Sequence, residues 1–175
     1  LRLRALWFIL PLFSVNYAAS AAIRGLWAGP YLEEVFAATG PMIGHATLLM
    51  GLAMIVGNFL AGPAVRAVGS VRRTILISTA GTVLVIGGLW LFTAHSLALA
   101  VTLLALVGFS GASYVLLIAH GRAFLPQHLV GRGVTFLNMF SIGGTGMLQF
   151  GSRPVYQWAS AHGSPAQAYA TLFLF

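Results

Sequence analysis

Long runs of apolar residues with almost no charge dominate this sequence. Each run is close to the roughly 20 residues that an α-helix needs to cross the hydrocarbon layer of a bilayer. Unbroken runs favour helices over strands, because a helix satisfies its own backbone hydrogen bonds in lipid. We expect five membrane spans and the start of a sixth, at residues 7–28, 42–62, 74–94, 97–118, 133–158 and 167–175.

The composition agrees with an integral membrane protein of the all-α class. Only 6% of the residues are charged, whereas a soluble domain needs about 25%. No soluble domain fits in the short connections, so residues 1–175 are expected to form one polytopic helix bundle with the lipid bilayer as its partner. The net charge of +7 does not indicate nucleic-acid binding, because the chain has no lysine-rich tract and no basic face with interleaved aromatic residues.

The arginines lie between the expected spans and predict the orientation of the bundle. Cytoplasmic loops of membrane proteins carry the excess of Lys and Arg. Three alternate segments hold most of the arginines, namely Arg2 and Arg4, then Arg66, Arg72 and Arg73, then Arg122 and Arg132. The other segments hold Glu33, Glu34, His95, His162 and Arg153. We therefore expect a cytoplasmic N-terminus, and the use of Arg to the exclusion of Lys favours a bacterial inner membrane.

The stretch GPAVRAVGSVRR resembles the loop signature of the major facilitator superfamily, Gly-x-x-x-Asp-Arg-x-Gly-Arg-Arg. In that family the signature joins the second and third helices of a six-helix half. Gly62 and Gly69 fall on its two glycines, and Arg72 and Arg73 supply the basic end two positions late. Arg66 occupies the acidic position and the chain contains no Asp, a departure that suits the degenerate copy of a C-terminal half.

Two further stretches are similar to bacterial members of this superfamily. FLPQHLVGRGVTFLNMFSIGG looks like the segment that leads into the fifth helix of the second half, and GLWAGPYLEEV looks like the outer end of its first helix. The resemblance implies half of a twelve-helix fold, with the missing N-terminal six-helix half as its partner. The sequence begins with Leu and stops inside the apolar ATLFLF, so we expect it to be cut at both ends.

Two of the expected spans carry polar residues at helical spacing. These residues are Asn16, Ser20, Arg24 and Trp27 in the first span, and Asn138, Ser141, Thr145, Gln149 and Arg153 in the fifth. Intervals of three and four residues place each set on one face of a helix. Such a face either joins packed helices or lines a watery cavity, and the long amides with a cation favour the cavity. The third span has only Thr and Ser as polar residues and is expected to face lipid.

These features predict a secondary active transporter that moves a small polar solute by alternating access. Arg24 favours an anionic group on the solute, and amide and phenol groups would orient it. The residues expected to contact the solute are Asn16, Tyr17, Arg24, Tyr114, Asn138 and Gln149. No cofactor, metal site or enzymatic activity is expected, because the spans hold no carboxylate pair, no Gly-Lys phosphate loop and no spaced His cluster.

Two alternatives remain open at the level of sequence. A non-transporting scaffold or assembly subunit would share the fold and tolerate changes in the polar stripes. The segment GFSG matches the nucleophile motif of rhomboid-type intramembrane proteases, and AHGR faintly resembles their histidine segment. Ser110 and His120 are about 15 Å apart if they share one helix, whereas a catalytic pair needs a hydrogen bond of about 3.2 Å. His45, on another span, is the remaining candidate base.

Overall fold

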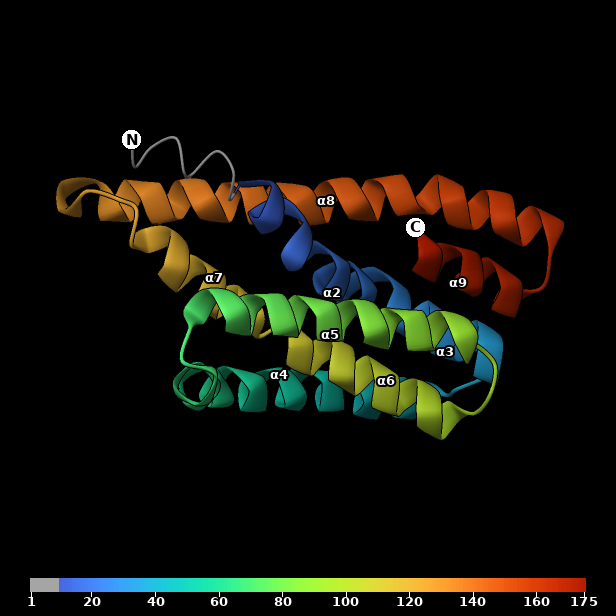
Figure 1. Cartoon of the computed structure of the whole chain (residues 1–175). Coiled ribbons are helices and arrows are strands. Elements are labelled where there is room, and N and C mark those ends of the chain that lie inside the picture. Colours follow the sequence, from blue (N-terminus) through green and yellow to red (C-terminus); the bar gives the residue numbers. More distant parts are fainter. Residues whose placement is uncertain (1–9) are drawn as a thin grey trace.

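The structure, a computed structural model, describes residues 10–175 as a bundle of helices (Figure 1). No strand occurs in this range. The first segment is helical over residues 10–16 and continues through α2 (Ala18–Ala22), the π turn (Ile23–Trp27) and α3 (Ala28–Phe36). It is followed by α4 (Gly40–Val68), α5 (Val71–Leu91), α6 (Leu97–Ser110), α7 (Ser113–Arg122), a short 3-10 turn (Gln127–Leu129), α8 (Val130–His162) and α9 (Pro165–Leu174).

Three helical stretches are long and apolar enough to span a membrane, namely α4, α5 and the stretch Leu97–Arg122 that α6 and α7 form together. Large apolar side chains project from their outer surfaces, and Leu84 of α5 is 76% exposed. The chain is therefore an integral membrane protein of the all-α class. The other expected spans, 7–28, 133–158 and 167–175, fall in the first segment, α8 and α9. The expected start of the first span, Trp7, lies outside the described residues.

Two helices continue through prolines that lie just beyond the expected ends of the spans. Pro30 lies inside α3 and Pro63 inside α4, so the expected ends at residues 28 and 62 are too early. Proline has no N–H group and leaves a carbonyl one turn earlier without its helical partner. Membrane helices tolerate this loss through neighbouring helices and local changes of helix pitch. The π turn, directly before α3, is such a change of pitch.

The arginine-rich segment forms a tighter turn than the expected loop of residues 62–73. Only Gly69 and Ser70 separate α4 from α5. Gly69 has a φ angle of +72°, in the left-handed region that glycine adopts without strain. The Ser70 hydroxyl accepts a hydrogen bond from the backbone N–H of Arg73 at 3.4 Å and so caps α5. The helices themselves carry the other residues of the motif, Gly62 and Arg66 near the end of α4, and Arg72 and Arg73 at the start of α5.

Two glycines allow pairs of helices to meet backbone to backbone. A Cβ atom placed on Gly108 of α6 would lie 2.3 Å from the carbonyl oxygen of Met50 in α4. A Cβ atom on Gly144 of α8 would lie 2.0 Å from the carbonyl oxygen of Ser14 in the first segment. Small residues at close crossings are typical of membrane helices. These two contacts fix α4 against α6 and the first segment against α8.

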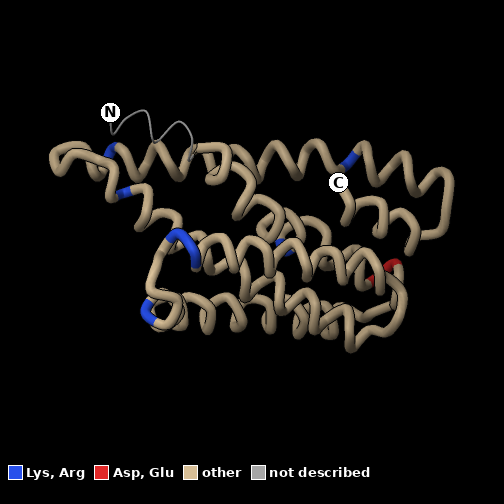
Figure 2. Tube along the Cα trace, in the orientation of Figure 1, with Lys and Arg blue, Asp and Glu red and all other residues tan. Residues whose placement is uncertain are grey.

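Most of the charged residues lie at the two ends of the bundle (Figure 2). Five arginines gather where α4 meets α5 and where α7 meets α8, the acidic residues lie at the opposite end, in α3, and Arg24 and Arg153 lie away from the basic end, in the π turn and in α8. Within residues 10–175 the basic end holds Arg66, Arg72, Arg73, Arg122 and Arg132. Arg2 and Arg4 lie outside the described residues. At the acidic end, the Tyr156 hydroxyl of α8 donates a hydrogen bond to the carboxylate of Glu34.

We predict that Gly144→Ala destabilises the bundle more than Gly143→Ala does. A methyl group at position 144 would overlap the Ser14 carbonyl, and overpacking of this kind costs about 1–3 kcal/mol. An added Cβ at Gly143 meets no atom within 4 Å. Gly143→Ala should therefore act only through the higher helix propensity of Ala, which favours the folded state. The measurement is the free energy of unfolding in mixed micelles at increasing SDS. Equal values for the two variants would contradict the close contact between α8 and the first segment.

Candidate functional site

The polar residues of the first segment contact two different sets of neighbours. Asn16 is 7% exposed, and its Nδ2 donates to the Thr79 hydroxyl of α5 at 2.7 Å. Its Oδ1 accepts a hydrogen bond from the Ser113 hydroxyl of α7 at 3.0 Å. Amides that join packed membrane helices in this way contribute about 0.6 kcal/mol per bond. This placement assigns Asn16 to a packed seam between three helices and not to an accessible face.

The π turn separates Trp27 from the Asn16 seam. A π turn is wider than a turn of α-helix, so it shifts the residues after it around the helix axis. The Trp27 indole Nε1 donates to the Ser152 hydroxyl of α8 at 2.9 Å, and its ring centroid lies 5.0 Å from that of Tyr156. The expectation that Trp27 shares one face with Asn16 is therefore wrong, because it assumed an uninterrupted α-helix.

Arg24 lies within the π turn, half-buried, and contacts α4. Its Nη2 donates to the Tyr17 hydroxyl at 3.2 Å, and its Nη1 lies 3.7 Å from the Met54 sulfur. The two acidic residues of the chain, Glu33 and Glu34, are exposed in α3. Within residues 10–175, then, Arg24 has a phenol and a thioether as partners and no carboxylate. A guanidinium in this setting retains donors for an anion.

Tyr17 connects Arg24 to α7 and α8. The ring centroids of Tyr17 and Tyr114 are 4.8 Å apart, with the rings tilted by 31°. The Tyr114 hydroxyl donates to the Oδ1 atom of Asn138. Tyr17, Tyr114 and Asn138 are each half-buried. A continuous chain of contacts thus runs from Arg24 on the first segment to Asn138 on α8.

Gln149 of α8 lies against Gly25, the residue that follows Arg24. A Cβ atom placed on Gly25 would lie 3.3 Å from the Gln149 Nε2 atom, so the amide lies against the backbone of the π turn. The lack of a side chain at Gly25 permits this approach. Contacts therefore join four of the six residues expected to contact solute, and Gln149 lies against Gly25, next to Arg24 in the sequence. We call these five residues the polar face: Tyr17, Arg24, Tyr114, Asn138 and Gln149.

The remaining residues of the expected stripe on α8 have other partners. Ser141 is fully buried, and its hydroxyl donates to the Phe13 carbonyl at 2.9 Å. The Thr145 hydroxyl bonds back to the Ser141 carbonyl at 3.0 Å, and Arg153 is exposed. Sequence reasoning missed Met54, because a thioether within an apolar span carries no polar signal. Its position on α4 becomes informative only through its contact with Arg24.

The residues of the protease alternative have separate environments. Ser110 is buried and its hydroxyl donates to the Val107 carbonyl at 3.0 Å. The His120 ring packs edge-on against Phe124 at 5.2 Å, and His45 is exposed on α4. These contacts do not join Ser110 to a histidine in the described part of the chain. Residues 10–175 also bring no three His, Cys, Asp or Glu side chains together in a way that could hold a metal ion.

Comparisons of the chain with protein-family models, with curated proteins and with solved structures find no match. The chemistry of the polar face is therefore the basis for a functional assignment. It combines a cation without a carboxylate partner, two stacked phenols and two amides. Such a set can hold an oxyanion by charge-assisted hydrogen bonds and orient the rest of a small molecule.

We predict that cysteine labelling separates the polar face from the packed seam. The chain has no Cys, and a thiol reacts with a polar maleimide only where water supports the thiolate. Asn138→Cys and Gln149→Cys should be labelled in intact membranes. Asn16→Cys should stay unlabelled because it is buried, and Leu84→Cys because its exposed side chain meets lipid. Labelling of Asn16→Cys as fast as Asn138→Cys would contradict the division between seam and face.

Proposed function

We propose that this chain is the C-terminal six-helix half of a major-facilitator-type secondary transporter that moves a small polar solute with an anionic group. Its partner in this proposal is an N-terminal six-helix half of the same protein. Support comes from the resemblance of residues 62–73 to the family's loop signature, from the separation of charge along the bundle, and from the polar face. Solutes of such transporters bind near the midplane of the membrane, between the two halves.

Arg24 is the observation that carries the proposal. A charged side chain within the membrane is costly and is a functional-site hypothesis by default. Tyr17 and Met54, its partners among residues 10–175, leave the charge of the guanidinium uncompensated. A carboxylate or a similar oxyanion can accept two parallel N–H bonds from a guanidinium. Bound solute would therefore supply the counter-charge that this chain's spans do not contain.

The other members of the polar face would contact the uncharged part of the solute. The paired rings of Tyr17 and Tyr114 offer an apolar surface, and the amides of Asn138 and Gln149 offer hydrogen-bonding groups. The two amides come from α8, whereas Arg24 and Tyr17 come from the first segment. Rocking of these helices against the N-terminal half would expose the face to each side of the membrane in turn.

The arginine-rich end is assigned to the cytoplasm in this proposal. Basic residues are retained on the cytoplasmic side of membrane proteins, and the basic end of the bundle contains the α4–α5 turn with Arg66, Arg72 and Arg73. The acidic end, with Glu33 and Glu34, then faces outward. The complete use of Arg in place of Lys supports a bacterial inner membrane.

We predict that Arg24→Gln weakens uptake of organic anions while Arg153→Gln does not. A hydrogen bond to a charged group contributes about 1.5–3 kcal/mol, so the KM of Arg24→Gln should rise by about 10- to 100-fold. Arg24→Lys keeps the charge but loses the forked geometry, and should show a smaller rise. Uptake of a panel of labelled carboxylates into proteoliposomes of the full-length protein measures the effect. Unchanged uptake by Arg24→Gln would overturn the assignment of this residue.

The scaffold alternative has one observation in its favour, since Asn16 and Ser141 serve in helix packing. We predict that the double change Asn138→Leu with Gln149→Leu abolishes uptake without lowering membrane abundance. The control is Met139→Leu with Met147→Leu, two exposed positions of the same helix. A scaffold should tolerate both pairs of changes equally, and full uptake by the Asn138/Gln149 pair would remove the case for a solute-binding face.

A further inference from the structure

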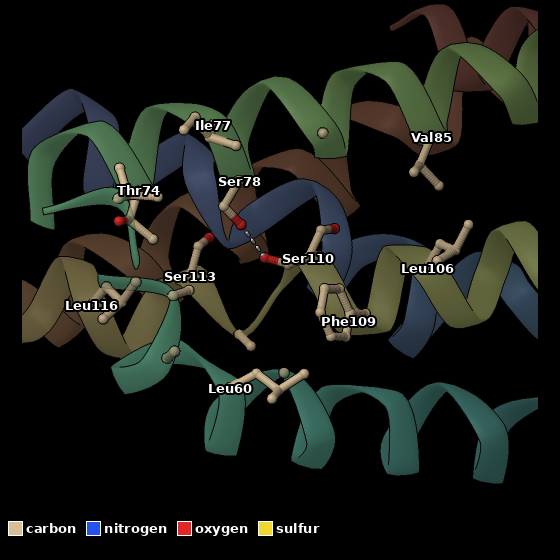
Figure 3. Close-up of a pocket in the computed structure, with 16 residues that line it drawn as sticks. Leu60, Thr74, Ile77, Ser78, Val85, Leu106, Phe109, Ser110, Ser113 and Leu116 are labelled. Atoms are coloured by element: carbon tan, nitrogen blue, oxygen red, sulfur yellow. Dashed lines mark hydrogen bonds between the residues drawn. The ribbon is translucent and has the colours of Figure 1, made fainter. Parts of the chain in front are cut away.

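A groove of about 330 Å³ lies between α4, α5 and the α6–α7 stretch (Figure 3). It opens to the outside of the bundle, because Leu60, Ile77 and Leu106 line it and are 47%, 61% and 42% exposed. None of the five residues of the polar face lines it. The groove is therefore a separate feature, on the outer surface of the three helical stretches that are apolar enough to span a membrane.

Small residues create the groove. Gly108 holds α6 tightly against α4. The small residues of α4 and α5 that line the groove do not fill the space between these two helices. Gly81 of α5 lines the groove, and an added Cβ there meets no atom within 4 Å. Ala61 and Ala64 of α4 also line it. The hollow thus remains although the helices around it are packed.

The hydroxyl groups that line the groove are all engaged by protein atoms. The Ser78 hydroxyl donates to the Ser110 carbonyl at 3.4 Å, the dashed bond in Figure 3. The other three also donate within the protein, Thr74 to the Ser70 carbonyl, Ser110 to the Val107 carbonyl and Ser113 to Asn16. The groove therefore offers a polar ligand none of these hydroxyl protons. Its lining suits a hydrocarbon chain instead.

One end of the groove lies at the basic end of the bundle. Val68 and Thr74 line it there, on either side of the Gly69–Ser70 turn. Arg73 is exposed and lies one helical turn before Ile77, on the same ridge of α5 as this groove residue. Arg72 precedes it, and the acidic residues of the chain are at the opposite end. Basic clusters beside membrane helices attract anionic lipid headgroups.

We propose that this groove binds one acyl chain of an anionic phospholipid whose phosphate pairs with Arg73. The apolar lining holds the hydrocarbon, and the arginines at its end select the charge of the headgroup. Arg66 stands where the superfamily signature has an acid, so no carboxylate in this turn competes for the arginines. The lipid site does not depend on the proposed transport activity, since it uses a different surface.

Native mass spectrometry of the purified protein, with phosphatidylglycerol and phosphatidylcholine of identical acyl chains, tests the headgroup. We expect phosphatidylglycerol to be retained in preference to phosphatidylcholine. Arg73→Gln should lower this preference about fivefold, the effect of one basic residue near an anionic lipid surface. Arg132→Gln, which removes an exposed arginine from the start of α8 at the same end, should leave it unchanged. Equal retention of the two lipids by the unaltered protein would overturn the proposal.

Filling the groove tests the acyl-chain site. Gly81→Leu and Gly81→Phe should reduce retention of phosphatidylglycerol, with the larger side chain having the larger effect. Gly44→Phe is the control, because an added Cβ at Gly44 on α4 also meets no atom within 4 Å but Gly44 does not line the groove. Circular dichroism establishes that the variants remain helical. Full retention by a folded Gly81 variant, or equal loss in Gly44→Phe, would show that the lipid binds elsewhere.

Discussion

Backbone contact between helices is the constraint on which the rest of this structure depends. Lipid is as apolar as a leucine-rich helix surface, so helices in a membrane associate by close van der Waals contact more than by burial of apolar area. Gly144 brings α8 against the first segment, and Gly108 brings α6 against α4. The first contact places Asn138 within reach of the Tyr114–Tyr17 pair. The second fixes α4, from which Met54 meets Arg24.

The polar residues of the bundle divide into two groups with different physical roles. In the seam, Asn16, Thr79 and Ser113 satisfy one another between three helices, which removes their polar atoms from lipid. On the polar face, Arg24 keeps a charge that its phenol and thioether neighbours do not neutralise. A packed helix contact explains the first group completely. It does not explain why the first segment should retain a half-buried cation without a carboxylate partner, and this difference motivates the proposal of an anionic solute.

The sequence predicts the class of the fold because its signals are additive over long stretches. The apolar runs predict the helices. The arginines between the runs predict that one end of the bundle is basic. Single residues of the site are less predictable. Asn16 and Asn138 have the same side chain and similar surroundings in the sequence, yet one is buried in the seam and the other is half-buried on the face. That distinction depends on which helix lies opposite, and no local pattern records it.

Local backbone geometry was the other limit on sequence reasoning. A helical wheel assumes constant pitch, and the π turn violates this assumption in the middle of the first segment. The second span was expected to end at residue 62, although α4 passes through Pro63 and ends at Val68. In both cases the surrounding helices and the lipid, which offers the backbone no competing hydrogen bonds, keep the chain helical where a soluble protein would turn.

The π turn also determines which changes of length the first segment can accept. Before it, Asn16 is in register with α5 and α7 and Ser14 with Gly144 of α8, and Trp27 at its end is in register with Ser152 of α8. A π turn holds about one residue more than a turn of α-helix, so removal of one residue between Ile23 and Trp27 would leave an α-helical turn and keep the two halves of the segment in register. Removal of a residue elsewhere in the segment would instead rotate one half against the other by about 100°, and its side chains would face the wrong neighbours. The π turn is therefore the place where the first segment can lose a residue with the least disturbance.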